Sequence, residues 1–133
     1  MRWLRIVLGS LVAEVLPIAG LIAVVAALGP HQAEGDRIFA EQVGRWFGPV
    51  AGFVATFGVG YWVARRAPSR PLLHGLAVGA GSAIVDVAIL VATSPPFDWV
   101  FVASNLGRVL AGWLAGTLAA TTNRAITERS ASS

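Results

Sequence analysis

Four side chains that carry charge or form strong hydrogen bonds lie within otherwise apolar stretches of the sequence: Glu14, Asp86, Asn105 and Arg108. A charged side chain near the centre of a bilayer costs about 2.5–3.5 kcal/mol on insertion scales, so it persists where it is paired, and often because it functions. At about 1.5 Å per helical residue, Asp86 and Arg108 lie at matching depths in their stretches. We therefore expect an Asp86–Arg108 ion pair, joined by Asn105 from the helix face that it shares with Arg108.

Two carboxylates face one guanidinium group in this buried charge network. Because Asp86 matches Arg108 in depth, we expect Asp86 to hold the guanidinium and Glu14 to remain among mostly apolar neighbours without a full charge partner. The long Arg108 side chain could also reach toward Glu14. A carboxyl group that loses hydration without compensation favours its protonated form, which makes Glu14 a candidate proton- or ion-binding residue. The alternative is structural: Glu14 is a permanently protonated, hydrogen-bonded group, and Asp86 with Arg108 orients two helices.

The neighbours of the two carboxylates add local expectations. Ser10 precedes Glu14 by four residues and Ser82 precedes Asp86 by four, so each carboxylate has a hydroxyl group on its own helix. Pro17 follows Glu14 by three residues. A proline removes one backbone hydrogen bond, which predicts a helix kink beside Glu14.

The segment Leu11–Val15, which reads LVAEV, resembles the first-helix motif of the small multidrug resistance transporters. The resemblance implies a four-helix proton antiporter that works as a dimer, in which Glu14 binds protons and cationic drugs in turn. It is confined to the first apolar stretch. The long polar segment 29–45 and the intramembrane Asp86 and Arg108 depart from that family's pattern, and an arginine in the site would repel cationic drugs. We therefore do not assign the chain to this family.

Other chemistry is sparse in the sequence. There is no cysteine, and His31 and His74 are too few and too far apart for a metal motif. No nucleophile–base pair and no phosphate-binding loop is visible. We therefore predict that the chain is not an enzyme and has no metal site and no cofactor. The net charge of +3 is small, so we interpret the arginines as topology signals and expect no nucleic-acid partner.

Long apolar segments must position these residues. Of 133 residues, 56% are hydrophobic and 13% are charged, about half of the roughly 25% charged residues found in soluble domains. Blocks of about 20 residues match the thickness of a bilayer's hydrocarbon core. The first block is too long for a signal peptide and contains Glu14 and Pro17. We predict an all-α membrane protein, a single domain of four transmembrane helices in the lipid bilayer, with spans at about residues 4–28, 47–64, 72–92 and 99–121.

The arginines predict the orientation of these spans. Seven lie at the N-terminus, between the second and third spans, or in the C-terminal tail, whereas only Arg37 and Arg45 lie on the other side. Cytoplasmic loops carry an excess of basic residues, so both termini should be cytoplasmic. Arginine without lysine, together with abundant Ala, Gly and Val, suggests a high-GC bacterial gene. We therefore expect a multi-pass protein of the bacterial inner membrane.

Two features of the spans remain open at the level of sequence. Apolar residues between Asp36 and Phe47 cluster on one helix face, with Asp36 as a cap, which predicts a short interfacial helix; the alternative is that this segment only leads into the second span. Small residues at a spacing of four predict tight packing, within one bundle or between copies in a homo-oligomer or larger complex. The packing glycines are Gly48, Gly52 and Gly60 in the second span, Gly75 and Gly79 in the third, and Gly112 and Gly116 in the fourth.

Two functions follow from this interpretation. The first is a small polytopic membrane protein whose buried charges serve packing and assembly, with a structural or accessory role. The alternative is a proton-linked small transporter or ion-conducting homo-oligomer that uses Glu14. A polar cavity that reaches Glu14 would favour the transporter, whereas a dry and fully paired network would favour the structural role.

Overall fold

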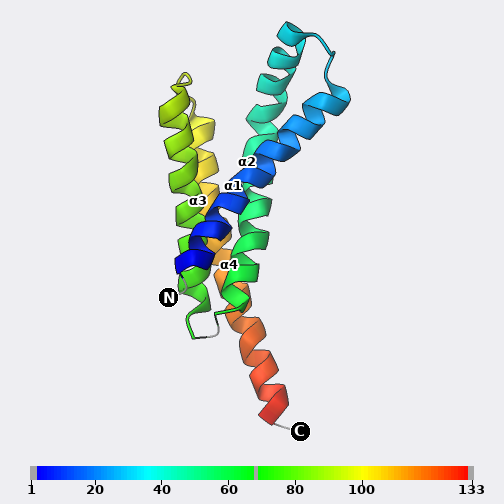
Figure 1. The fold of residues 1–133 in the computed structure, drawn as a ribbon. Helices are drawn as coiled ribbons and strands as arrows, with labels where there is room; N and C mark the ends of the chain where they lie inside the picture. The colour runs from blue at the N-terminus through cyan, green and yellow to red at the C-terminus, as the bar shows by residue number, and fades with distance from the viewer. Residues whose placement is uncertain (1–2, 68, 132–133) are drawn as a thin grey trace.

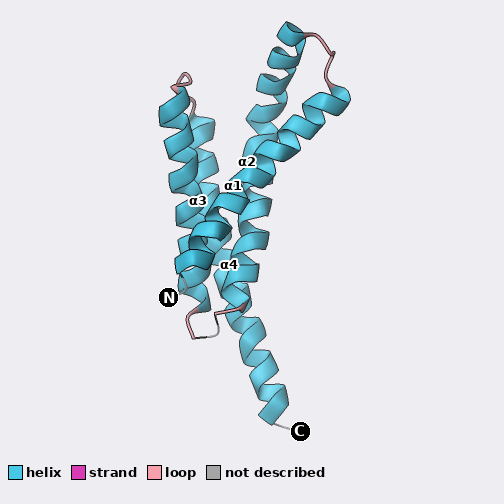
Figure 2. Ribbon diagram, in the orientation of Figure 1, coloured by secondary structure: helices cyan, strands magenta, loops and turns pink. Residues whose placement is uncertain are grey.

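The computed structural model describes residues 3–67 and 69–131, and within these ranges the chain forms four helices and no strand (Figures 1 and 2). The all-helical class predicted from the sequence is confirmed. The helices are α1 (Trp3–Leu28), α2 (Ala33–Arg65), α3 (Pro71–Thr93) and α4 (Trp99–Ala131). Three of them, α1, α2 and α3, are long and apolar enough to cross a membrane.

The first and third helices end where the sequence indicates, and the turn after α3 shows why. Ser94 adopts a left-handed conformation with φ of 46°, and its amide donates to the carbonyl oxygen of Leu90. This is a common way for a helix to end. Pro95 and Pro96 follow directly and cannot continue the helix. The left-handed cap and the two prolines therefore end α3 at Thr93.

The second helix begins earlier than predicted, and the prediction of a separate interfacial helix between residues 36 and 47 is wrong. α2 runs without a break from Ala33 to Arg65, so the segment leads directly into the second apolar stretch. Glu34 and Asp36 lie in its first turn, where negative charge favours the positive end of the helix dipole. Asp36 does not cap the helix: its Oδ1 accepts the backbone N–H of His31 at 3.0 Å, and Gln32 is the capping residue.

The fourth helix continues ten residues past the predicted end of the last span, to Ala131. Its C-terminal part extends beyond the other helices, in orange and red in Figure 1. α4 is not among the helices apolar enough to be recognised as a membrane span. The reason is its composition, since Asn105, Arg108 and several glycines and threonines interrupt its apolar residues.

The helices form two antiparallel hairpins, α1–α2 and α3–α4, that diverge toward the end holding the α1–α2 and α3–α4 connections (Figure 1). α2 packs against the other three helices, and α3 packs against α1, α2 and α4. α1 runs obliquely across this arrangement. Among the described residues, α1 and α4 have no backbone contact with each other.

Glycines allow the closest helix contact, between α3 and α4. A Cβ atom added at Gly75 would lie 2.5 Å from the carbonyl oxygen of Gly112, and one added at Gly79 would lie 2.6 Å from that of Arg108. A Cβ atom at Gly116 would lie 2.8 Å from the Cα of Leu72. These glycines bring the two backbones into direct contact, as small residues do between helices in membranes.

The glycines of α2 do not act as one stripe. A Cβ atom at Gly60 would lie 3.3 Å from the Cβ of Ala115 on α4, which is a close helix contact. A Cβ atom at Gly48 would have nothing within 4 Å, so Gly48 makes no close contact within the described bundle, and a packing role between copies stays a prediction. Gly52 faces a side chain rather than a backbone, as described below.

Polar side chains gather inside the bundle and large apolar side chains lie outside. The apolar core is small, with Ile6, Val63 and Val78 at its centre. Soluble domains show the opposite distribution, with charged residues almost never fully buried unless paired. The buried polar and charged residues are Ser10, Glu14, Thr56, His74, Ser82, Ser104 and Arg108.

Candidate functional site

The Arg108 side chain reaches from α4 into the centre of the bundle, where 4% of the residue is exposed. Its Nε donates to Glu14 Oε1 at 2.6 Å, and its Nη2 donates to Glu14 Oε2 at 3.2 Å. Nη2 also lies 3.3 Å from Asp86 Oδ1, and Nη1 donates to the hydroxyl of Ser104. The guanidinium group therefore bonds to two carboxylates and one hydroxyl, and its two-point contact is with Glu14.

Glu14 is well satisfied, although it was expected to lack a charge partner. It is 3% exposed, and Oε1 accepts the hydroxyl of Ser82 at 2.5 Å in addition to the Arg108 bond. Ser82 in turn lies 3.3 Å from the hydroxyl of Thr56. All four helices thus contribute to the network, and the expectation that Glu14 faces mostly apolar neighbours is wrong.

Asp86 is held more loosely than Glu14. Its Oδ1 has the 3.3 Å contact with Arg108, and its Oδ2 accepts the Nδ2 of Asn105 at 2.7 Å. One fifth of its side chain is exposed. The expected roles of the two carboxylates are therefore reversed: Glu14 takes the two-point ion pair, and Asp86 shares the same guanidinium through one longer bond.

The expected pairing of Asp86 with Arg108 was based on depth along each helix, as if the helices were parallel, and this is why it misassigned the two carboxylates. α1 runs obliquely, so Glu14 comes close to the long side chain of Arg108. The serines also bond differently from the expectation. Ser82 bonds to Glu14 on another helix rather than to Asp86, and Ser10 donates to the carbonyl oxygens of Ile6 and Val78 rather than to Glu14.

Gly52 makes room for the guanidinium group. A Cβ atom at this position would lie 3.0 Å from Arg108 Nη2 and 3.1 Å from its Cζ. The sequence pattern identified Gly52 only as a helix-packing residue. The spacing of small residues in the sequence does not reveal that Gly52 contacts an arginine on another helix.

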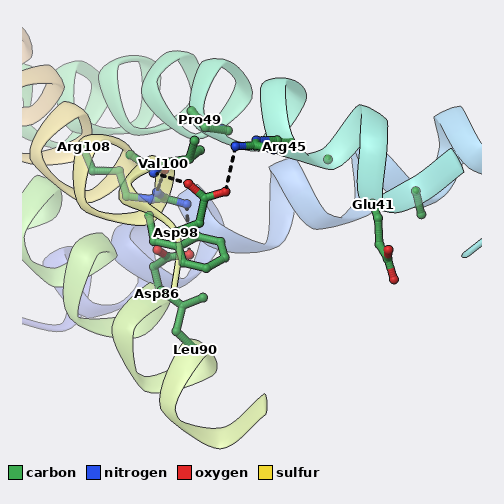
Figure 3. Close-up of a pocket in the computed structure, with 13 residues that line it drawn as sticks. Glu41, Arg45, Pro49, Asp86, Leu90, Asp98, Val100 and Arg108 are labelled. Carbon is green, nitrogen blue, oxygen red and sulfur yellow. Dashed lines mark hydrogen bonds and ion pairs between the residues drawn. The ribbon is translucent and has the colours of Figure 1, made fainter. Parts of the chain in front are cut away.

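A cavity of about 370 Å³ opens between α2, α3 and α4 at the end where the hairpins diverge (Figure 3). Asp86, Arg108 and Ser104 line its inner part, whereas Glu14 does not line it. The remaining lining residues are Ala40, Glu41, Gly44, Arg45, Gly48, Pro49, Leu90, Asp98, Val100 and Phe101. The cavity therefore reaches the network from the side of Asp86.

An ion pair that the sequence analysis missed lies at the rim of this cavity. Arg45 Nη2 is 3.1 Å from Asp98 Oδ2, and Asp98 Oδ1 accepts the backbone N–H of Val100 at 3.0 Å (Figure 3). The pair ties α2 to the start of α4. In the sequence these residues appeared only as charges on the same side of the membrane, and that shared side was the available signal.

Other residues singled out in the sequence lie outside this chemistry. Pro17 is buried within a continuous α1, and the predicted kink stays a prediction. His74 is buried, and its Nδ1 lies 2.8 Å from the carbonyl oxygen of Arg70. Asn105 Oδ1 is buried and has no hydrogen-bond partner in the part of the chain that the structure describes. Within residues 3–67 and 69–131, no three potential metal ligands gather.

No protein-family model matches this chain, and no curated protein or solved structure is significantly similar to it.

Proposed function

We propose that the chain is an integral protein of the cell membrane, bacterial in origin, that crosses the bilayer four times with both termini in the cytoplasm. Three helices meet the length and hydropathy of a span. The polar residues that lower the hydropathy of α4 face inward, since Ser104 and Arg108 are buried, while Leu106 and Leu110 are exposed. An inward-facing polar stripe with an apolar outer surface is what a spanning helix needs. The arginine distribution supports the orientation.

Within the membrane we propose a structural role, as an accessory or assembly protein whose buried charge network fixes how the helices fit together. The observation that supports this role is the Glu14–Arg108 pair. Glu14 has three hydrogen bonds at its two oxygens, is almost fully buried and does not line the cavity that Asp86 and Arg108 line. A paired charge of this kind specifies one arrangement of helices, because any other arrangement leaves a charge in a medium of low dielectric constant.

The test of this role is the double variant Glu14→Gln/Arg108→Gln, which removes both charges and keeps groups that form hydrogen bonds. We expect this variant to restore most of the phenotype of a deletion strain, but less than wild type does, because Asp86 also loses its ion-pair partner. We expect neither the wild-type protein nor the variant to dissipate a proton gradient in liposomes. A double variant that melts like wild type but fails to complement the deletion would contradict the structural role.

A second candidate function, a proton-linked or ion-conducting carrier, gains support from the cavity. Its reactive carboxylate would then be Asp86 rather than Glu14, because Asp86 lines the cavity and its side chain is 20% exposed. Two carboxylates share one guanidinium group in the network, so one negative charge is left over beside the cavity. In proteoliposomes this function predicts a proton or cation flux that Asp86→Asn abolishes.

A further inference from the structure

A second hollow lies at the opposite end of the molecule, between the start of α3 and the part of α4 that extends beyond the bundle. It has a volume of about 660 Å³. Arg70 and Arg124 line it from the two helices, against one carboxylate, Glu128. The other lining residues are Ser69, Pro71, Leu72, Leu73, Ala120, Asn123 and Thr127. We call this hollow the α3–α4 groove.

The groove contains an unsatisfied hydrogen-bond donor. Asn123 lines it, and the buried Nδ2 of Asn123 has no partner among the described residues. Buried amide donors without partners are rare in folded proteins, so each one needs an explanation. A ligand oxygen that the Asn123 side chain turns to meet would supply the missing acceptor.

The start of α3 adds to the positive character of the groove. Arg70 is the capping residue of this helix, and its side chain makes no capping hydrogen bond. Pro71 begins the helix and has no N–H, so the first amides without a carbonyl partner within the helix are those of Leu72 and Leu73, at the positive end of the helix dipole. Two arginines, an unpaired amide donor and this helix end therefore converge on one hollow, which is the chemistry that binds a phosphate group.

The position of the groove distinguishes a lipid phosphate from a dissolved one. Leu72 and Leu73 line the groove within one turn of Arg70 and are 40% and 44% exposed. Their exposed apolar surface continues toward the apolar part of the bundle, while the arginines lie toward the C-terminal extension of α4. At the same end, the guanidinium of Arg66 lies 4.3 Å from the centre of the Trp62 ring. Tryptophan is enriched at membrane–water interfaces.

We infer that the α3–α4 groove binds the phosphate headgroup of an anionic phospholipid, with one acyl chain along Leu72 and Leu73. This inference rests on the proposed membrane orientation, because anionic lipids attract basic residues at the cytoplasmic face. The bound lipid would join the start of α3 to the extended end of α4. Asn123 and the two arginines are the residues that hold its phosphate.

The experiment is native mass spectrometry of the full chain in detergent with phosphatidylglycerol added, and with phosphatidylcholine as the neutral lipid. We expect one phosphatidylglycerol per chain. The variant Arg70→Gln/Arg124→Gln should weaken this binding about tenfold or more, since each arginine near a headgroup contributes measurably. The matched control is Arg65→Gln/Arg66→Gln, which removes the same charge at the same end of the molecule but outside the groove, and it should change binding less than about twofold.

Asn123→Leu serves as a second variant, because it removes the donor without changing charge. It should weaken phosphatidylglycerol binding while retaining the wild-type melting temperature. Equal binding by the groove variants and the Arg65/Arg66 control would overturn the inference, as would displacement of the lipid by millimolar inorganic phosphate, which would identify a free anion as the ligand. Failure of the protein to remain in membranes after carbonate extraction would instead contradict the proposed function.

Discussion

Glu14 on α1 and Arg108 on α4 form a two-point ion pair although the backbones of their helices do not touch. The Arg108 side chain reaches from α4 to α1 and passes Gly52 on α2. It bonds to the Glu14 oxygen that also accepts the hydroxyl of Ser82 on α3. The first and last helices are thus linked through the centre of the bundle by side chains alone. The stability of the fold should depend strongly on this one contact.

Single removal of either partner should destabilise the protein severely. Glu14→Ala or Arg108→Ala leaves a buried charge without its partner, which costs about 3–5 kcal/mol for a buried pair. Unfolding by denaturing detergent, followed by circular dichroism, measures the loss. The double variant should recover part of it, with a coupling energy larger than that of the Asp86–Arg108 pair. Equal coupling energies for the two pairs would contradict the geometry described above.

Asp86→Ala should cost less than Glu14→Ala in the same assay. Asp86 has one longer contact with the guanidinium and is partly exposed to the cavity, whereas Glu14 keeps the two-point pair with Arg108 when Asp86 is removed. We expect a loss of about 1.5–3 kcal/mol, typical of a hydrogen bond to a charged group. A loss as large as that of Glu14→Ala would mean that Asp86 is the principal partner.

Gly52→Ala should disturb the network without changing any charge. The added methyl group would lie 3.0 Å from Arg108 Nη2, so the guanidinium has to shift by a few tenths of an ångström within its bonds to Glu14. Overpacking of this kind costs about 1–3 kcal/mol. Gly58→Ala on the same helix is the control, because nothing lies within 4 Å of its added methyl group and a helical alanine is intrinsically favoured. The thermal melting temperatures of the two variants should therefore move in opposite directions.

Gly112→Ala should separate α3 from α4. The new Cβ atom would lie 2.5 Å from the carbonyl oxygen of Gly75, a backbone atom that cannot rotate away. Gly107→Ala on the same helix places its methyl group 3.8 Å from Phe53, which is an ordinary contact. We expect the folded yield in detergent to fall sharply for Gly112→Ala and to stay near wild type for Gly107→Ala. Similar yields for both variants would argue against direct backbone contact.

Labelling of introduced cysteines tests the orientation, since the chain has no cysteine of its own. Gln32→Cys, exposed in the α1–α2 connection, should react with a membrane-impermeant thiol reagent added to intact cells. Ser69→Cys, exposed between α2 and α3, should react only after the cells are opened. The reverse pattern would invert the topology, and labelling of both in intact cells would reject the number of spans.

The sequence was sufficient to predict the helices whose ends have a local cause. α1 and α3 lie within a residue of their expected limits, because Gly29 and the proline pair after Ser94 follow long and largely apolar runs. The extent of α2 was not predictable in this way. Its first turns are polar and charged, and they remain helical through acidic residues at the helix start and the bonds of Arg37 to Glu34 and Glu41.

The members of the charge network were predictable by residue type, whereas their pairing was not. Glu14, Asp86, Asn105 and Arg108 stand out because charge and amide groups are rare in apolar helices. Which carboxylate meets the guanidinium depends on the oblique course of α1 and on the space at Gly52. Both are properties of the assembled bundle, so counting residues along each separate helix cannot predict them.

The link between the first and the last helix also sets an order of events during synthesis. During synthesis in a membrane, Glu14 enters before Arg108, which follows 94 residues later. Until α4 arrives, Ser82 is the one described partner that bonds to Glu14, because Arg108 is on α4 and both described partners of Asp86, Asn105 and Arg108, are on α4 as well. α4 therefore supplies the positive charge that pairs with the buried acids of α1 and α3. A nascent chain truncated before residue 108 should remain open to degradation, so quality control can recognise an unfinished protein by its unpaired acids.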